Sequence, residues 1–168
     1  MPDNILTVGY INIRGQTGLP VAKQLQIESF ARYNGCDILH LQEANIVDET
    51  FRNCSFIQSS YNIIENNATN RYGTASLVRT DLKTDNIRFD SEGRVIIFDI
   101  EDITFGNIYL HSGTDSKSRT GREKYSCDIL PGLLMNSKES GCIGGDFNCI
   151  VEKKDATNHP DSKLSKGL

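Results

Sequence analysis

Residues 36–43, CDILHLQE, form an apolar run that ends in two polar residues, Gln42 and Glu43. The apolar residues do not alternate with polar ones, which is typical of a strand buried on both faces. His40 lies inside the run and is interpreted as a core residue. The stretch is therefore predicted to be an interior strand of a sheet that is covered by helices.

The residues before this stretch predict a parallel βαβ unit. Residues 5–13 form another β-prone run, which ends at the polar group Asn12-Ile13-Arg14-Gly15. A helix is expected between the two strands, with Pro20 near its start and Asn34-Gly35 as its stop. Its apolar face is predicted from residues at helical spacing, namely Leu19, Ala22, Leu25 or Gln26, Ser29 and Phe30. Strand, helix and strand within about 40 residues favour parallel pairing.

The chain after this unit is predicted to be mainly antiparallel β-structure. Short β segments between turn-rich stretches are expected at 55–58, 61–65, 73–79, 87–89, 94–100 and 103–110. A polar loop then leads to a helix over about 121–135, kinked or interrupted at Pro131-Gly132. A last apolar strand is expected around Cys142 and Ile143. The whole pattern predicts an α/β fold with mixed sheets.

Length and charge limit the possible functions. A chain of 168 residues that is 38% hydrophobic can bury one core, so a single domain over 1–168 is expected. The net charge of -4 argues against a protein held on nucleic acid mainly by phosphate neutralisation. Any contact with DNA must therefore be local.

Cysteine usage and the lack of apolar leader or span indicate the compartment. The five cysteines include no Cys-x-x-Cys pair, which favours reduced thiols over disulfides or a zinc site. The sequence shows no basic leader before an apolar stretch and no run approaching roughly 18 apolar residues. We therefore expect an intracellular chain that is neither secreted nor inserted in a membrane.

Polar residues follow three of the predicted strands, each at its carboxyl end. They are Asn12, the pair Gln42-Glu43, and Asp146 with Asn148. In α/β sheets this edge is where ligand crevices form, so the three groups can build one site. All of them offer oxygen ligands, which suit Mg²⁺ or Mn²⁺ better than zinc. Such a site favours phosphate chemistry, in which Asp146 orients or deprotonates an attacking water.

Five short motifs occur in the order found in the endonuclease/exonuclease/phosphatase superfamily. They are Asn12-Ile13-Arg14-Gly15, Leu41-Gln42-Glu43, Tyr72-Gly73-Thr74-Ala75, Asn107-Ile108-Tyr109 and Gly145-Asp146-Phe147-Asn148. Over roughly residues 4–151 the chain most resembles the apurinic-type endonuclease domain of LINE-like (non-LTR) retrotransposons. The resemblance implies a DNase I-like fold, a four-layer α/β/β/α sandwich with mixed sheets. It also implies an endonuclease that nicks DNA by metal-dependent phosphodiester hydrolysis.

The resemblance implies a role for each matching residue. Glu43 would be the principal ligand of Mg²⁺ or Mn²⁺, with Asn12 near the metal. Tyr109 would direct its hydroxyl at the scissile phosphate, Asp146 would align or activate the water, and Asn148 would hydrogen-bond a phosphate oxygen. The resemblance further implies DNA as substrate, the nucleus as the place of action, and a reverse transcriptase domain in the parent polyprotein. Phe147 is expected to point back into the core.

The chain departs from the family pattern in two places. After Tyr109 the family usually continues with a small residue, proline and asparagine, whereas this chain has Leu110-His111-Ser112. The family's later aspartate and its terminal Ser-Asp-His motif, whose histidine stabilises the transition-state phosphate, do not occur before Leu168. None of His40, His111 and His159 is expected to replace that histidine. Together with the polar tail 152–168, these departures suggest a domain that lacks its C-terminal part.

Two further hypotheses stay open. The same site would serve a DNA-repair apurinic endonuclease or a phosphatase of small phosphoesters, because the surrounding loops set the substrate. Alternatively, the chain is a catalytically inactive remnant that retains weak nucleic-acid or protein binding.

A basic segment follows Tyr109. Arg119 and Arg122, together with two lysines, outnumber the acidic residues of 115–124. These two arginines are predicted to steer a DNA backbone towards the site, and a solvated helix start is the alternative interpretation.

Overall fold

The computed structural model describes residues 5–15, 19–46, 50–51, 53–67, 73–113 and 115–149. Its strands are β1 (Val8–Asn12), β2 (Ile38–Gln42), β3 (Tyr61–Asn66), β4 (Thr74–Arg79), β5 (Asp85–Phe89), β6 (Val95–Ile100), β7 (Ile103–Tyr109) and β8 (Ser140–Asp146). Its helices are α1 (Val21–Asn34), α2 (Ser55–Ser60), α3 (Ser116–Lys124), the π-helical turn η1 (Tyr125–Ile129) and α4 (Leu130–Leu134).

The strands form two mixed sheets. The first has the order β1-β2-β4-β3 and the second has the order β5-β6-β7-β8. β1 and β2 are parallel, with Asn12 opposite Gln42, so the predicted βαβ unit is confirmed. β7 and β8 are the other parallel pair, with Tyr109 opposite Asp146. The remaining neighbours are antiparallel, as the turn-rich middle of the sequence predicts.

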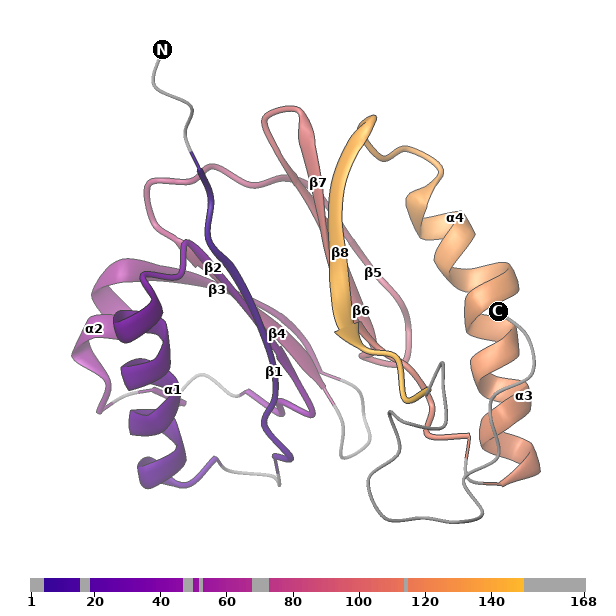
Figure 1. Ribbon diagram of the computed structural model, residues 1–168, viewed down its shortest axis with the longest axis horizontal. Coiled ribbons are helices and arrows are strands. Elements are labelled where there is room, and N and C mark those ends of the chain that lie inside the picture. The colour runs from indigo at the N-terminus through magenta and orange to yellow at the C-terminus, as the bar shows by residue number, and fades with distance from the viewer. Residues whose placement is uncertain are drawn as a thin grey trace.

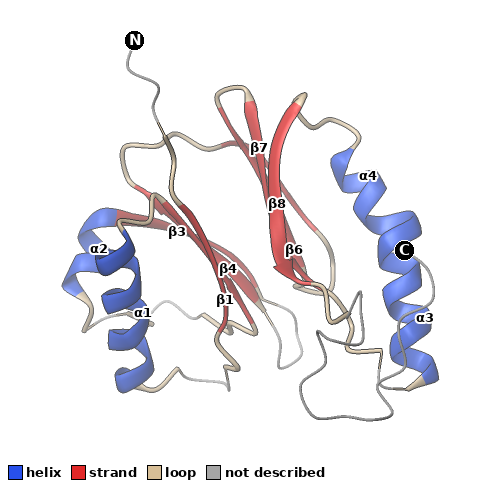
Figure 2. Cartoon of the chain, viewed as in Figure 1, coloured by secondary structure: helices blue, strands red, loops and turns tan. Residues whose placement is uncertain are grey.

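The two sheets face each other, and helices cover their outer sides (Figure 1). α1 and α2 lie on the first sheet, and α3 and α4 lie on the second (Figure 2). Three groups of buried side chains correspond to the three interfaces between these layers. The middle interface contains the stacked rings of Phe98 and Phe105, with His40 against Phe98. The predicted four-layer α/β/β/α sandwich is therefore confirmed. No helix in the described residues is long and apolar enough to cross a membrane.

The predicted face of α1 is wrong, although Leu19, which was part of it, is buried just before the helix. Its buried residues are Gln24, Ile27 and Ala31, whereas Leu25 and Phe30 are exposed. Gln24 is polar but belongs on the core side, because its amide donates to the Leu19 carbonyl at 2.6 Å and accepts from a backbone N–H at 3.1 Å. A buried glutamine in this role hides the apolar periodicity on which the prediction depended.

Residues 55–58 were predicted as a strand but belong to α2. The segment is too short and has too few apolar residues to show a period. Ile57 is fully buried, and Phe56 packs edge-on against Tyr61, so tertiary packing selects the helix.

The helix predicted over 121–135 begins earlier, at Ser116. Asp115 caps it by accepting from the Ser118 N–H at 2.8 Å, and Ser118 returns a side-chain bond to the backbone N–H of Asp115. The irregularity predicted at Pro131-Gly132 takes the form of the π-helical turn η1 just before Pro131. Proline has no N–H to donate and crowds the preceding turn, which accounts for a wider turn at this place.

Candidate active site

The site lies at one end of the sandwich, where four strands reach their carboxyl ends. Asn12 ends β1, Gln42 ends β2, Tyr109 ends β7 and Asp146 ends β8. In Figure 1 this is the lower end of the two sheets. Parallel pairing of β1 with β2 and of β7 with β8 brings these ends together, so residues far apart in the sequence become neighbours.

Asn12 lies between two carboxylates. Its Nδ2 donates to Glu43 Oε1 at 3.0 Å and to Asp146 Oδ2 at 2.7 Å, and its Oδ1 accepts from the Arg14 N–H at 2.9 Å. Glu43 follows β2 in the first sheet, whereas Asp146 belongs to the second sheet. The group therefore joins the two sheets, and all three side chains are only partly buried.

These side chains fit a hard divalent cation. The partly positive Asn12 amide already lies between the carboxylates of Glu43 and Asp146, which is the charge pattern that a cation would satisfy. Rotation of the amide would present Oδ1 in place of Nδ2. Among the described residues, no histidine, cysteine or further carboxylate joins Glu43 and Asp146 as a third potential ligand. Mg²⁺ commonly uses one or two carboxylates and keeps several waters, so the Glu43 carboxylate and the Asn12 amide oxygen suit it, with the charge of Asp146 close by.

Tyr109 lies in the second sheet and is 7% exposed. Burial raises the pKa of Tyr109 to about 12, and the charge of Glu43 and its hydrogen bond with the phenol act in the same direction, against Arg94. The phenol is thus a neutral hydrogen-bond donor at physiological pH. Arg94 lies 5.1 Å from the centre of the Tyr109 ring and donates to the Tyr109 carbonyl at 3.3 Å. It holds the ring in place by a cation–π contact and a backbone hydrogen bond.

Asn148 lies in the turn after β8. Its N–H donates to Asp146 Oδ1 at 2.9 Å, and its Nδ2 donates to the Leu110 carbonyl at 2.7 Å. Its φ of 49° is left-handed, as is the φ of 53° at Glu43. Both residues therefore turn sharply out of their strands, which directs their side chains away from the pleat of the sheet. One hydrogen of the Asn148 amide remains for a further acceptor.

The two arginines of the basic segment have different surroundings. Arg122 is half-buried, and its Nη1 donates to the Asn148 carbonyl at 2.6 Å. Arg119 is exposed, and its Nε lies 3.4 Å from the Asp115 carbonyl, at the helix start. The structure thus connects Arg122 to the Asn148 turn and leaves Arg119 on the surface of α3.

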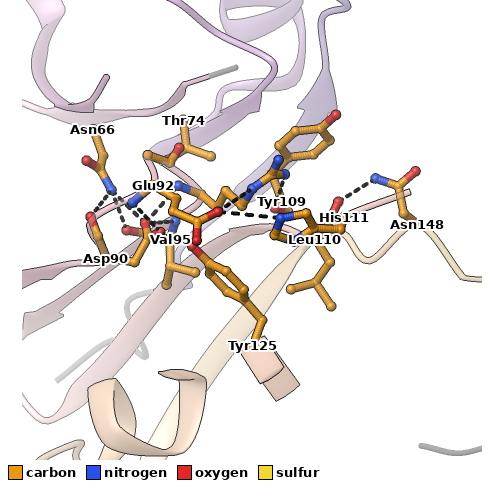
Figure 3. A network of polar contacts seen from close by, with 12 residues as sticks. Asn66, Thr74, Asp90, Glu92, Val95, Tyr109, Leu110, His111, Tyr125 and Asn148 are labelled. Carbon is orange, nitrogen blue, oxygen red and sulfur yellow. Dashed lines mark hydrogen bonds and ion pairs between the residues drawn. The ribbon is translucent and has the colours of Figure 1, made fainter. Parts of the chain in front are cut away.

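A carboxylate-centred network supports the loop beneath Tyr109 (Figure 3). Asp90 is buried and accepts from the backbone N–H groups of Arg94 and Val95, each at 2.7 Å. Figure 3 shows Asn66 and Tyr125 also reaching Asp90, which connects the first sheet and η1 to this turn. Asp90 is a structural residue that fixes Arg94.

The contacts of the two histidines in the described chain are with groups other than Glu43 and Asp146. His40 is fully buried, and burial lowers its pKa to about 3. It stacks on Tyr10 with ring centres 4.7 Å apart and bonds Ser76 Oγ through Nδ1 at 2.8 Å, which confirms it as a core residue. His111 Nε2 lies 3.4 Å from Glu92 Oε2. Burial, followed by the charge of Arg94, lowers the pKa of His111. His159, Tyr72 and the tail 152–168 lie outside the described residues.

Gly144 and Gly145 allow close packing within the protein. A Cβ on Gly144 would lie 2.7 Å from the Tyr10 ring, and one on Gly145 would lie 1.9 Å from the Ile108 carbonyl oxygen. Both glycines therefore lie against neighbouring strands, Gly144 against β1 and Gly145 against β7. Phe147 packs against the core between the second sheet and η1, as predicted.

Sequence reasoning missed two contributors to the site. Arg94 belongs to none of the motifs, and the antiparallel pairing of β6 with β7 brings it against Tyr109. Asn107 was quoted as part of a motif without a role, yet its fully buried amide bonds Gln42 across the two sheets at 2.7 Å. A buried amide in an otherwise apolar strand was the available signal.

Comparisons with known proteins identify the fold. No family model and no curated protein matches the sequence. Among solved structures, the chain is similar to an AP endonuclease from Archaeoglobus fulgidus (TM-score 0.69, 20% identity, 92% of this chain and 62% of that chain). It is also similar to TDP2 from C. elegans (0.60, 21%, 93% and 51%) and to the 3′ phosphatase NExo from Neisseria bound to a product DNA hairpin (0.71, 17%, 90% and 61%).

The chain spans between about half and just under two thirds of the length of these proteins. Similarity at this level of identity concerns the arrangement of the elements, and here it covers 90–93% of this chain. The chain has the α/β fold of the endonuclease/exonuclease/phosphatase proteins.

Proposed function

We propose that the chain carries the site of a divalent-metal-dependent phosphodiesterase that nicks DNA, of the type found in non-LTR retrotransposons. The observation that carries the proposal is the Asn12 amide held between Glu43 and Asp146 across the two sheets, at 3.0 and 2.7 Å. Tyr109 and Asn148 add two hydrogen-bond donors from the same end of the second sheet. Two carboxylates and neutral donors around one point suit a reaction at a phosphate.

Hydrolysis would join a water oxygen to phosphorus, break one P–O bond of the DNA chain and protonate the leaving oxygen. Mg²⁺ or Mn²⁺, held by Glu43 and the Asn12 oxygen, would supply charge stabilisation on the phosphate. Asp146 would orient the water and accept its proton, with its Oδ1 held by the Asn148 N–H and its Oδ2 released when the Asn12 amide rotates towards the cation. Tyr109 would turn the O–H of its neutral phenol from Glu43 to a phosphate oxygen, and Asn148 would donate its remaining amide hydrogen to another.

The solved structures support DNA as the substrate class. They include an AP endonuclease, a phosphatase bound to a DNA hairpin product and a TDP2 bound to a single-stranded DNA product. The retrotransposon type, a neighbouring reverse transcriptase domain and action in the nucleus rest on the motif resemblance. The assignment of residues 1–168 to the N-terminal portion of a single endonuclease domain, with residues 152–168 as a polar tail, also rests on the motif resemblance.

Plasmid relaxation tests the proposal. The purified chain should convert supercoiled plasmid to the open-circular form with Mg²⁺ and not with EDTA. Glu43→Gln and Asp146→Asn should each slow this by on the order of 10²–10⁴-fold, because each removes a charge at the reacting phosphate. Glu101→Gln is the matched control, since this exposed carboxylate lies in the turn between β6 and β7, at the other end of those strands. Equal rates for all four proteins would contradict the proposal.

A substrate panel separates the alternatives within the fold. An intact duplex, a duplex with one abasic site and a small aryl phosphate monoester should be offered at equal concentration. Preference for the intact duplex supports the retrotransposon type, preference for the abasic duplex supports a repair enzyme, and preference for the monoester supports a phosphatase. DNA binding without cleavage of any substrate would identify an inactive remnant.

A further inference from the structure

A pair of buried amides lies directly beneath the candidate site. Gln42 Nε2 donates to Asn107 Oδ1 at 2.7 Å, and the two side chains are 1% and 0% exposed. Gln42 belongs to β2 in the first sheet and Asn107 to β7 in the second. This hydrogen bond therefore crosses the interface between the sheets.

The Asn107 amide nitrogen also donates to the first sheet. Its Nδ2 donates to the Leu41 carbonyl at 3.1 Å and to the Ala75 carbonyl at 2.9 Å. One side chain of the second sheet thus bonds to two strands of the first. Directional bonds of this kind hold a distance and a register, which apolar packing alone specifies much less strictly.

The position of the pair relates it to the site. Gln42 immediately precedes Glu43 and lies opposite Asn12, and Asn107 is two residues before Tyr109 and opposite Gly144. Asn12 and Glu43 are carried by the first sheet, whereas Tyr109 and Asp146 are carried by the second. The distance between the two halves of the site is therefore a distance between sheets. Placement errors of about 1 Å are enough to cost an enzyme on the order of 10²-fold in rate.

We propose that Gln42 and Asn107 are positioning residues that set the separation between the two halves of the site. They act through Glu43 and Tyr109 and touch no reacting atom. The inference rests on the proposed function when the rate of DNA nicking is the readout. It rests only on the Asn12–Asp146 contact when amide hydrogen exchange is the readout.

The test uses length-changing variants of the full chain. Gln42→Asn shortens the Gln42 side chain by one methylene, so the Gln42–Asn107 connection between the sheets becomes too short. The double swap Gln42→Asn with Asn107→Gln restores the summed length of the two side chains. Ser76→Ala is the matched control, because it also removes one buried side-chain hydrogen bond, at 2.8 Å to His40, but within the first sheet. Urea unfolding of each variant separates stability from position.

Two readouts decide between a positioning and a merely structural role. In plasmid nicking, Gln42→Asn should lower kcat at least tenfold with KM within about threefold, and the swap should recover most of the loss. In EDTA, NMR exchange of the Asn12 side-chain amide hydrogens should accelerate about tenfold in Gln42→Asn and return towards wild type in the swap. Ser76→Ala should change neither readout, although it loses comparable stability.

The outcomes separate the two proposals. If the wild-type chain nicks no DNA, the proposed function fails, while the amide exchange still tests the positioning role. If Gln42→Asn and Ser76→Ala behave alike in amide exchange, or the swap recovers nothing, the positioning role is wrong even in an active enzyme.

Discussion

Asn12 Nδ2 and Asp146 Oδ2 lie 2.7 Å apart although 134 positions separate the two residues in the chain. The contact joins the last residue of β1 to the last residue of β8 and closes the site between the two sheets. Asn12 also donates to Glu43, so its amide bonds one carboxylate from each sheet.

Replacing Asn12 with aspartate should make the fold sensitive to divalent cations. Asn12→Asp places a third carboxylate beside Glu43 and Asp146 and removes both hydrogen bonds, so we expect a Tm several degrees lower in EDTA. Added Mg²⁺ should raise the Tm of the variant more than that of wild type, because a cation binds more tightly to three charges. Thermal scans across a Mg²⁺ titration measure this. Asn62→Asp, on the exposed side of β3, is the control and should show no Mg²⁺-dependent gain.

Acidification should destabilise the fold through His40. Its pKa of about 3 in the folded state lies below the ordinary 6.5, so the unfolded chain binds the proton more readily between these values. The contribution of neutral His40 is therefore present above pH 6.5 and is lost as the pH falls towards 3, by about 1.4 kcal/mol per pH unit. From pH 7 to 5 the unfolding free energy should drop by about 2 kcal/mol more in wild type than in His40→Gln, as measured in urea. Parallel pH profiles would show that His40 does not contribute.

Gly144→Ala should strain the contact between β8 and β1. The new methyl group would lie 2.7 Å from the Tyr10 ring, so we expect a loss of about 1–3 kcal/mol in unfolding free energy. In a Tyr10→Leu background, Gly144→Ala should lower the unfolding free energy by less than it does in wild type, because the ring that the new methyl group would meet is absent. Gly132→Ala is the control, since a Cβ there meets nothing within 4 Å and the residue lies in α4. That substitution should be neutral or stabilising.

Tyr109→Phe should reduce activity without a comparable loss of stability. The change removes one neutral donor, so kcat for plasmid nicking should fall on the order of 10²-fold while KM changes little. Since the pKa of Tyr109 is about 12, the wild-type rate should show no decline from this phenol up to about pH 10. A rate loss with an apparent pKa below 10 that is absent in Tyr109→Phe would contradict this assignment.

Arg119 and Arg122 should give different phenotypes although each substitution removes one positive charge. Arg119→Ala should weaken DNA binding and reduce the slope of log K against log salt by about one, with kcat unchanged. Arg122→Ala removes the donor at 2.6 Å from the Asn148 carbonyl, so kcat should also fall, by roughly tenfold. Salt-dependent binding in EDTA and nicking in Mg²⁺ measure the two effects separately. If neither variant changes the salt slope, the basic segment does not contact DNA.

The apolar pattern was sufficient for the α/β class with mixed sheets, because the interior strands are nearly uninterrupted apolar runs and their turns are marked by glycine and asparagine. The four layers followed from the family resemblance. The apolar pattern was insufficient for the face of α1, because Gln24 is buried to satisfy backbone groups, and for α2, where only packing of Ile57 and Phe56 selects the helix. Intrinsic propensity is a weak guide in both places.

The candidate site was predictable to the extent that it follows strand ends. Asn12, Glu43 and Asp146 share a position relative to apolar runs, and that position is visible without coordinates. The contact of Arg94 with Tyr109 and the Gln42–Asn107 hydrogen bond are not visible in this way, because they depend on the register of β6 with β7 and on how one sheet docks on the other. Local pattern specifies each half of the site, and only tertiary structure specifies their separation.

The division of the site between two sheets has a consequence for folding. Each sheet can form its own strand pairs before the other is in place, but neither alone holds both carboxylates. Bringing Asn12 and Asp146 together requires closure of nearly the whole chain, which is a slow and late event compared with hairpin formation. Partly folded molecules would therefore lack the assembled centre, and any catalytic activity would report that docking of the sheets is complete.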